Sequence, residues 1–127
     1  MALSKENGIK FLCNLEGTHQ RLKMLHWSTE CKAEHLLTDD IDDAVLDCED
    51  SIAENIMGKL GVRFGNGDLK SMLPESTTLK SLLDEMEDDA NSFKNSIGDS
   101  DEYAGVINII DDYLENINKW RYLSTFR

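Results

Sequence analysis

The sequence is poor in proline and contains no long apolar run. Pro74 is the only proline among 127 residues, so long stretches of the chain are free to form helices. No run of about 18 apolar residues occurs, which argues against a transmembrane helix and against a membrane as partner. The first residues also lack the apolar stretch of a signal peptide, and we therefore expect a cytoplasmic protein.

Cysteine is also scarce, because Cys13, Cys31 and Cys48 are the only three in the chain. An odd number of cysteines without CxxC spacing argues against a disulfide framework and against a zinc site made of thiolates. We expect three reduced side chains that are buried as small apolar residues.

Basic residues are outnumbered by acidic ones. Lys and Arg total 13 and Asp and Glu total 25, which gives a net charge of −12. A surface of this sign repels phosphate backbones, so the charge argues against sequence-independent DNA binding. It could attract cations, and it also keeps a protein in solution. Charge by itself does not choose between these two roles.

What the sequence does contain is helical periodicity in four segments. These are residues 5–28, 33–60, 78–97 and 101–123. In each segment apolar residues recur at spacings of three, four and seven, which places them on one face of a helix. The stripe of the second segment consists of Ile41, Val45, Cys48, Ile52 and Ile56. We expect Gly61 to end this helix, and Ser76, Thr77 or Thr78 to cap the start of the next one.

Residues 61–76 interrupt the helical pattern with glycines and with Pro74. This composition predicts a loop, and the loop is long enough to cross from one end of a helix bundle to the other. Short, long and short connections predict a single all-α domain, residues 1–127, with a ferritin-like four-helix bundle and one long crossover between the second and third helices. An up-down bundle with only short connections is the competing layout.

Four potential metal ligands share one stripe of the second helix. They are His35, Asp39, Asp50 and Glu54. At about 100° per residue they lie within about 100° of one another and nearly opposite the apolar stripe. Asp39 and Asp50 are eleven residues apart, or about 16 Å along the axis, so one helix cannot bring all four to one ion. The stripe therefore divides into two half-sites, each an i, i+4 pair that can converge on a small ion.

An antiparallel copy of this helix across a two-fold axis would set the His35 half-site beside the Asp50 half-site. The spacing therefore predicts a homo-oligomer, a dimer at least, with a metal site between the subunits that occurs twice per dimer. The alternative is that these carboxylates form an ordinary solvated face of a surface helix.

His26, which is followed by Trp27 near the end of the first helix, is a candidate fifth ligand. Histidine with several carboxylates and no thiolate suits Fe(II) or Mn(II), and Zn(II) is a further possibility. The alternative for His26 is a satisfied histidine of the core. We interpret His19, seven residues earlier on the apolar face of the same helix, as a packed core histidine.

On one unbroken helix His26 and His35 would point in opposite directions. The chain must therefore turn within residues 28–34 if both are to reach one site. No glycine or proline marks this turn, and Ser28 or Thr29 is the best candidate for the N-cap that begins the second helix.

These residues together resemble the Dps-like miniferritins over most of the chain. The likeness rests on His26-Trp27, His35-x3-Asp39 and Asp50-x3-Glu54 followed by Leu60-Gly61. In that family such motifs build a ferroxidase site between subunits. The resemblance implies that His26, His35 and Asp39 come from one subunit and that Asp50 and Glu54 come from its partner.

The resemblance also implies an activity. Fe(II) would bind at this site and be oxidised, commonly by hydrogen peroxide, and the ferric product would be stored in a hollow shell, typically of twelve subunits. Trp27 would lie beside the site, where it would shield it or take part in electron transfer. The rival hypothesis is a ferritin-like structural or assembly protein that oligomerises without turning over iron.

Overall fold

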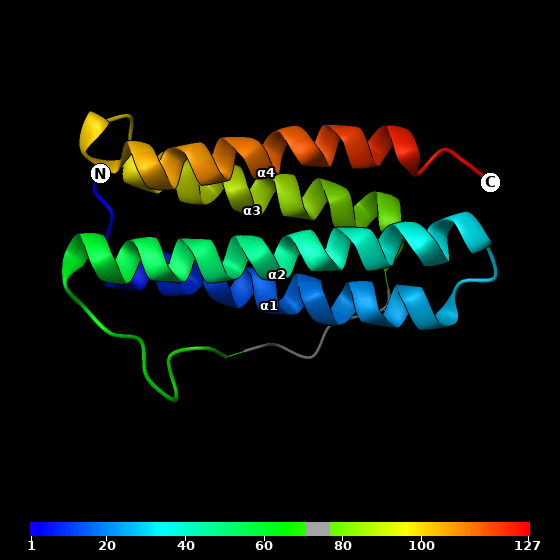
Figure 1. Ribbon diagram of the computed structural model, residues 1–127, viewed down its shortest axis with the longest axis horizontal. Helices are drawn as coiled ribbons and strands as arrows, with labels where there is room; N and C mark the ends of the chain where they lie inside the picture. Colours follow the sequence, from blue (N-terminus) through cyan, green and yellow to red (C-terminus); the bar gives the residue numbers. More distant parts are fainter. Residues whose placement is uncertain (71–76) are drawn as a thin grey trace.

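The computed structural model describes residues 1–70 and 77–127, and within them the chain is entirely helical apart from its connections (Figure 1). The elements are α1 (Lys5–Ser28), α2 (Lys32–Leu60), α3 (Leu79–Ile97), the short 3-10 helix η1 (Asp101–Tyr103) and α4 (Ala104–Leu123). The prediction of an all-α chain with four helices is therefore confirmed. The last helix differs in one detail, because its first turn is the 3-10 turn of η1.

Local signals set the ends of these helices. Gly61 ends α2 in the left-handed conformation at φ 68°, where a residue without Cβ pays no steric penalty. Thr78 caps α3, and its hydroxyl accepts a hydrogen bond from the backbone N–H of Ser81. Both were predicted from the sequence, whereas Ser76, another predicted candidate for this cap, lies outside the described residues.

The helices pack as a bundle in which α1 contacts α2 and α3, and α4 contacts the same two helices. Glu34 in the first turn of α2 and Leu79 at the start of α3 line one cavity, so both helices begin at the same end of the bundle. At the other end, Lys59 near the end of α2 pairs with Glu102 of η1. It follows that α2 and α3 run parallel, and that α2 ends far from where α3 begins (Figure 1). The described part of their connection, residues 61–70, contains no helix.

The core lies between the four apolar stripes. The predicted stripe of α2 is buried at each of its positions. Aromatic rings form part of the core, where Phe11 stacks on Phe93 with ring centroids 4.6 Å apart. All three cysteines are free thiols, as expected, but only Cys48 is buried and the other two are half-buried.

One close approach fixes how α1 lies on α2. Gly8 is buried in α1, and a Cβ at this position would lie 2.6 Å from Cδ1 of Ile56. A larger residue at this position would require the end of the Ile56 side chain, which is fully buried, to shift.

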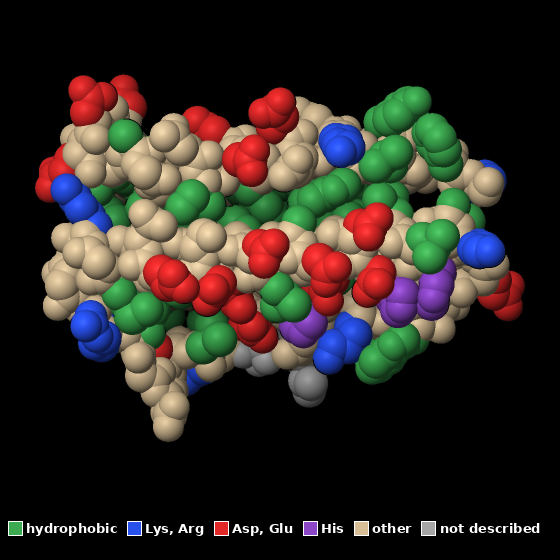
Figure 2. All heavy atoms as spheres, viewed as in Figure 1, with side chains coloured by type: hydrophobic (Ala, Val, Ile, Leu, Met, Phe, Trp, Pro, Cys, Tyr) green, Lys and Arg blue, Asp and Glu red, His purple; other side chains and the backbone are tan. Residues whose placement is uncertain are grey.

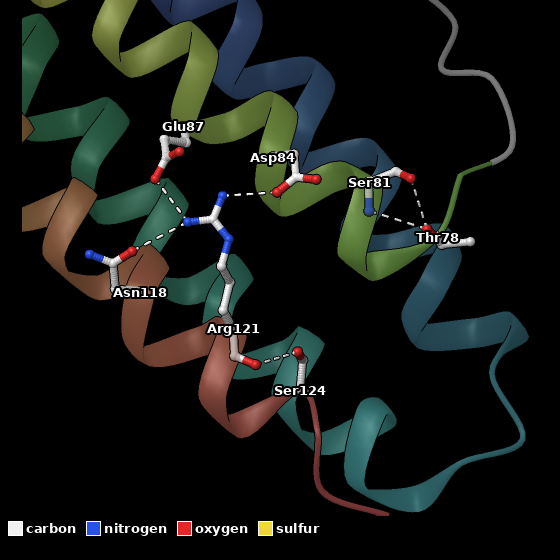
Figure 3. Close-up of polar contacts among 7 residues, drawn as sticks. All are labelled: Thr78, Ser81, Asp84, Glu87, Asn118, Arg121 and Ser124. Atoms are coloured by element: carbon white, nitrogen blue, oxygen red, sulfur yellow. Dashed lines mark hydrogen bonds and ion pairs between the residues drawn. The ribbon is translucent and has the colours of Figure 1, made fainter.

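A polar cluster joins α3 to α4 on the outside of the bundle (Figure 3). The guanidinium group of Arg121 donates to Asp84 at 2.9 Å and to Glu87 at 2.8 Å, and these carboxylates raise the pKa of the arginine further. Exposed ion pairs of this kind contribute at most about 1 kcal/mol each, so the buried stripes dominate the stability.

Among residues 1–70 and 77–127, no helix is long and apolar enough to cross a membrane.

Candidate metal centre

A short turn joins α1 to α2 and brings the two histidines together. α1 ends at Ser28 and α2 begins at Lys32, so the chain reverses over three residues. The predicted turn within residues 28–34 is confirmed, but the predicted N-cap is wrong. Thr29 is the C-cap of α1, and Cys31 precedes α2 without a side-chain cap. The hydroxyl of Thr29 accepts a hydrogen bond from the backbone N–H of Cys31 instead, which tightens the reversal.

His26 and His35 form a stacked and reciprocally hydrogen-bonded pair. Their ring centroids are 3.8 Å apart and their planes differ by 17°. Nδ1 of His26 lies 2.6 Å from the carbonyl oxygen of His35, and Nδ1 of His35 lies 2.7 Å from the carbonyl oxygen of His26. A carbonyl oxygen only accepts hydrogen bonds, so each Nδ1 carries the proton and donates it. Nε2 is then the free nitrogen of both rings.

Each ring is therefore held in the tautomer that a metal ligand needs. Histidines that bind metals through one nitrogen usually donate the other N–H to a carbonyl or carboxylate, which fixes the ring. The hydroxyl of Thr38 lies 3.4 Å from Nδ1 of His26 and closes the buried side of the pair. His35 is exposed and His26 is half-buried, so the alternative of His26 as a core histidine does not hold.

The predicted carboxylate ligands all lie on the exposed face of α2. They are Asp39, Asp50 and Glu54. Within the described part of the chain none of the three forms an ion pair with a basic side chain. Figure 2 shows a band of acidic side chains on this face of the bundle, with two histidine side chains toward one end of the band. The band is a concentrated negative charge that attracts cations.

We call His26, His35 and Asp39 the histidine half-site, and Asp50 and Glu54 the acidic half-site. Fifteen residues separate His35 from Asp50, which is about 22 Å along the helix. In residues 1–70 and 77–127, no three His, Cys, Asp or Glu side chains converge on a point that could hold a metal ion. The single chain thus brings the two histidines together and leaves the half-sites apart.

A second polar cluster on the seam between α1 and α2 was not predicted. His19 is not a packed core residue, because it is half-buried and its Nδ1 lies 2.6 Å from Oδ1 of Asp42. One turn further along α1 and two turns further along α2, burial and the neighbouring Glu16 raise the pKa of Glu49 to about 8. Glu16 and His19 are three residues apart on α1, and Asp42 and Glu49 are seven apart on α2. These spacings place each pair on one face of its own helix, and this much is visible in the sequence. They do not reveal which two helices bring the pairs together.

Neither a protein-family model, nor a curated protein, nor a solved structure matches this chain. The resemblance to Dps-like miniferritins therefore rests on the residues named above.

Proposed function

We propose that this protein is a Dps-like miniferritin, whose subunits pair to bind Fe(II) and to oxidise it at sites between them. The observation that carries the proposal is the reciprocal bonding of His26 and His35. Two exposed or half-exposed imidazoles with free Nε2 atoms lie at one end of a helix, and two uncommitted carboxylates lie near its other end. An antiparallel partner helix would complete the ligand set at both ends.

The chemistry of the ligands is compatible with iron. The set contains nitrogen and oxygen donors without thiolate, which suits Fe(II) and Mn(II) and also admits Zn(II). The two ring planes are nearly parallel, and an imidazole lone pair lies in the plane of its ring. One ion could bind both imidazoles only where the two ring planes meet about 2.1 Å from each Nε2, and nearly parallel planes do not meet so close to the rings. We therefore expect each imidazole to hold its own ion, and the centroid distance of 3.8 Å would allow the two ions to lie about 3.5–4 Å apart, which is common in two-metal sites.

Two neighbouring Fe(II) ions match a two-electron oxidant. Hydrogen peroxide would take one electron from each of two Fe(II) ions and, with two protons, give two Fe(III) ions and two water molecules. The protein would bind and position the iron, while the iron itself supplies the redox chemistry. The acidic band on α2 would attract Fe(II) to the site.

The arrangement of the helices supports the ferritin-like crossover over the up-down layout. In an up-down bundle consecutive helices are antiparallel, whereas α2 and α3 run parallel here. A connection between parallel helices must span the length of the bundle, and a single such connection is typical of ferritin-like folds.

Complementation between inactive variants tests the proposal. Asp50→Ala/Glu54→Ala removes the acidic half-site and His26→Ala/His35→Ala removes the histidine half-site. We expect each double variant alone to lose Fe(II) oxidation, measured as the appearance of ferric absorbance after addition of peroxide. A refolded mixture should regain activity, because a mixed dimer holds one intact site.

The matched control is Asp88→Asn, which removes one exposed carboxylate from α3, and circular dichroism checks the helical content of every variant. Full activity in both double variants, or a strictly monomeric protein, would contradict the proposal. A folded oligomer that takes up no iron would favour the rival, a ferritin-like assembly protein.

A further inference from the structure

We infer that Trp27 of each subunit inserts into an apolar cavity of its partner, beside the partner's acidic half-site, so that two tryptophans lock the dimer. The inference rests on the proposed intersubunit site, because the pairing of the half-sites sets the register. It assigns a docking role to a side chain and to a cavity that iron binding alone does not explain.

The inserting residue is one of three exposed large apolar side chains near the turn between α1 and α2. Trp27 is 66% exposed, and Leu36 of α2 and Met24 of α1 are 56% and 51% exposed. Large apolar side chains that gather on a surface beside charged groups often mark an interaction site. Trp27 is also the type of residue that most often anchors protein interfaces.

The receiving cavity lies at the other end of the α1–α2 face and has a volume of about 240 Å³. Apolar side chains from three elements line it: Ile9 and Leu12 of α1, Ala53 and Met57 of α2, and Phe64 and Leu69 of the following connection. An apolar cavity of about 150 Å³ in a protein takes up benzene, so this one has room for a larger indole ring. Asp50 of the acidic half-site is also part of its wall.

The register within one subunit follows from contacts between antiparallel neighbours. His26 stacks on His35, and His19 pairs with Asp42. Two residues at the same height along α1 and α2 therefore have numbers that add up to about 61. Trp27 is therefore level with the first turn of its own α2.

The register between subunits follows from the two half-sites. Antiparallel pairing of the histidine half-site with the partner's acidic half-site places the two-fold axis close to Ala44, midway between them along α2. The same axis carries Trp27 to the level of the partner subunit's Glu54. The partner subunit's Ala53 and Met57, which line the cavity, lie within about one helical turn of that level.

The lateral position agrees with this register. The proposed two-fold axis lies in the interface and runs across α2. It exchanges the two ends of the face, but it leaves the α1 side of one subunit opposite the α1 side of the other. Trp27 lies on α1, and the cavity opens where α1 meets α2. Figure 2 shows hydrophobic side chains on the α1 side of the acidic band, near both of its ends.

Charge and the remaining apolar residues on this face also fit a second copy of the chain. Nζ of Lys23 lies 5.8 Å from the centre of the Trp27 ring, so the tryptophan would bring a positive charge to the carboxylates of the partner's Asp50 and Asp68 at the cavity. Leu46 is 38% exposed and lies close to the proposed axis, where it would meet the partner's Leu46. Fe(II) would offset the repulsion between the two acidic bands.

The test measures dimer dissociation by sedimentation under argon with Fe(II) and without oxidant. Trp27→Ala removes the inserted ring, and Ala53→Phe fills the cavity. We expect each to raise the dimer dissociation constant by about 100-fold or more, because tryptophan anchors at interfaces are commonly worth this much. Tyr122→Ala is the matched control, since Tyr122 is an aromatic residue 64% exposed on α4, and it should leave the constant unchanged.

Acrylamide quenching of tryptophan fluorescence gives an independent measurement on the wild-type protein. Trp120 is buried, so quenching reports on Trp27. We expect quenching to fall when the dimer forms. A dimer with protected Trp27 that neither binds nor oxidises iron would uphold the docking and refute the ferroxidase proposal. A dimer that oxidises iron while Trp27 stays accessible, or while Trp27→Ala dimerises normally, would overturn the docking alone.

Discussion

The contact between Gly8 and Ile56 allows a sharp test of how α1 packs on α2. In Gly8→Ala the new methyl group would lie 2.6 Å from Cδ1 of Ile56, whose side chain is fully buried. Forcing an extra methyl group into a packed core costs about 1–3 kcal/mol. Alanine regains up to about 1 kcal/mol of helix propensity relative to glycine. The net change in the free energy of unfolding should therefore lie between zero and a loss of about 3 kcal/mol.

Gly17→Ala on the same helix is the matched control, because a Cβ at Gly17 would meet nothing within 4 Å. This variant should gain up to about 1 kcal/mol. The difference between the two variants isolates the steric cost at Gly8, which we expect to be about 1–3 kcal/mol. Urea unfolding followed by circular dichroism measures both free energies, provided that the slope of the free energy of unfolding against urea concentration is the same as in the wild type.

A third variant identifies the atom responsible. Ile56→Val deletes Cδ1, the atom nearest to the new methyl group, and by itself costs about 0.5–1.5 kcal/mol. Combined with Gly8→Ala it should recover most of the steric cost, so the two changes should be less harmful together than their sum. If Gly8→Ala stabilises the protein as much as Gly17→Ala does, the Ile56 side chain makes room for the methyl group and the expected steric cost is wrong.

Two further predictions concern buried polar groups. The pKa of Glu49 is raised to about 8, so between about pH 4.5 and 8 the folded state holds a proton that the unfolded chain releases. This contribution to the stability is complete below about pH 4.5 and is lost as the pH rises through 8, and Glu49→Gln should remove it. The melting temperature of the metal-free variant should therefore fall less between pH 5 and 9 than that of the metal-free wild type. An equal fall in both proteins would refute the raised pKa. The hydroxyl of Tyr113 is buried without a hydrogen-bond partner among the described residues. Tyr113→Phe should therefore leave the melting temperature unchanged or raise it, and a marked loss would reveal a partner for the hydroxyl.

The helices and their faces followed from the sequence, because helix formation is governed by spacing and by local caps. The stripe from Ile41 to Ile56 is buried as predicted, and Gly61 and Thr78 act at the ends where they were expected. The separation of the two half-sites also followed from the sequence alone, since the rise per residue fixes the distance between Asp39 and Asp50 on any helix.

The contacts between helices needed the tertiary structure. A turn within residues 28–34 was predicted, but the spacing did not indicate that the reversal at Thr29–Cys31 would let His26 and His35 stack and lock each other's tautomer. The pairing of Glu16 with Glu49 likewise depends on how far α1 is shifted along α2.

The physical reason is the range of the interactions. A periodic pattern records which side of each helix avoids water, and this information is local. The rotation and shift of one helix against another are set by interlocking side chains far apart in the chain, such as Gly8 against Ile56. The sequence by itself determined four amphipathic helices and two separated half-sites, and only their packing decided that two imidazoles meet at one end of the α1–α2 face and an apolar cavity opens at the other.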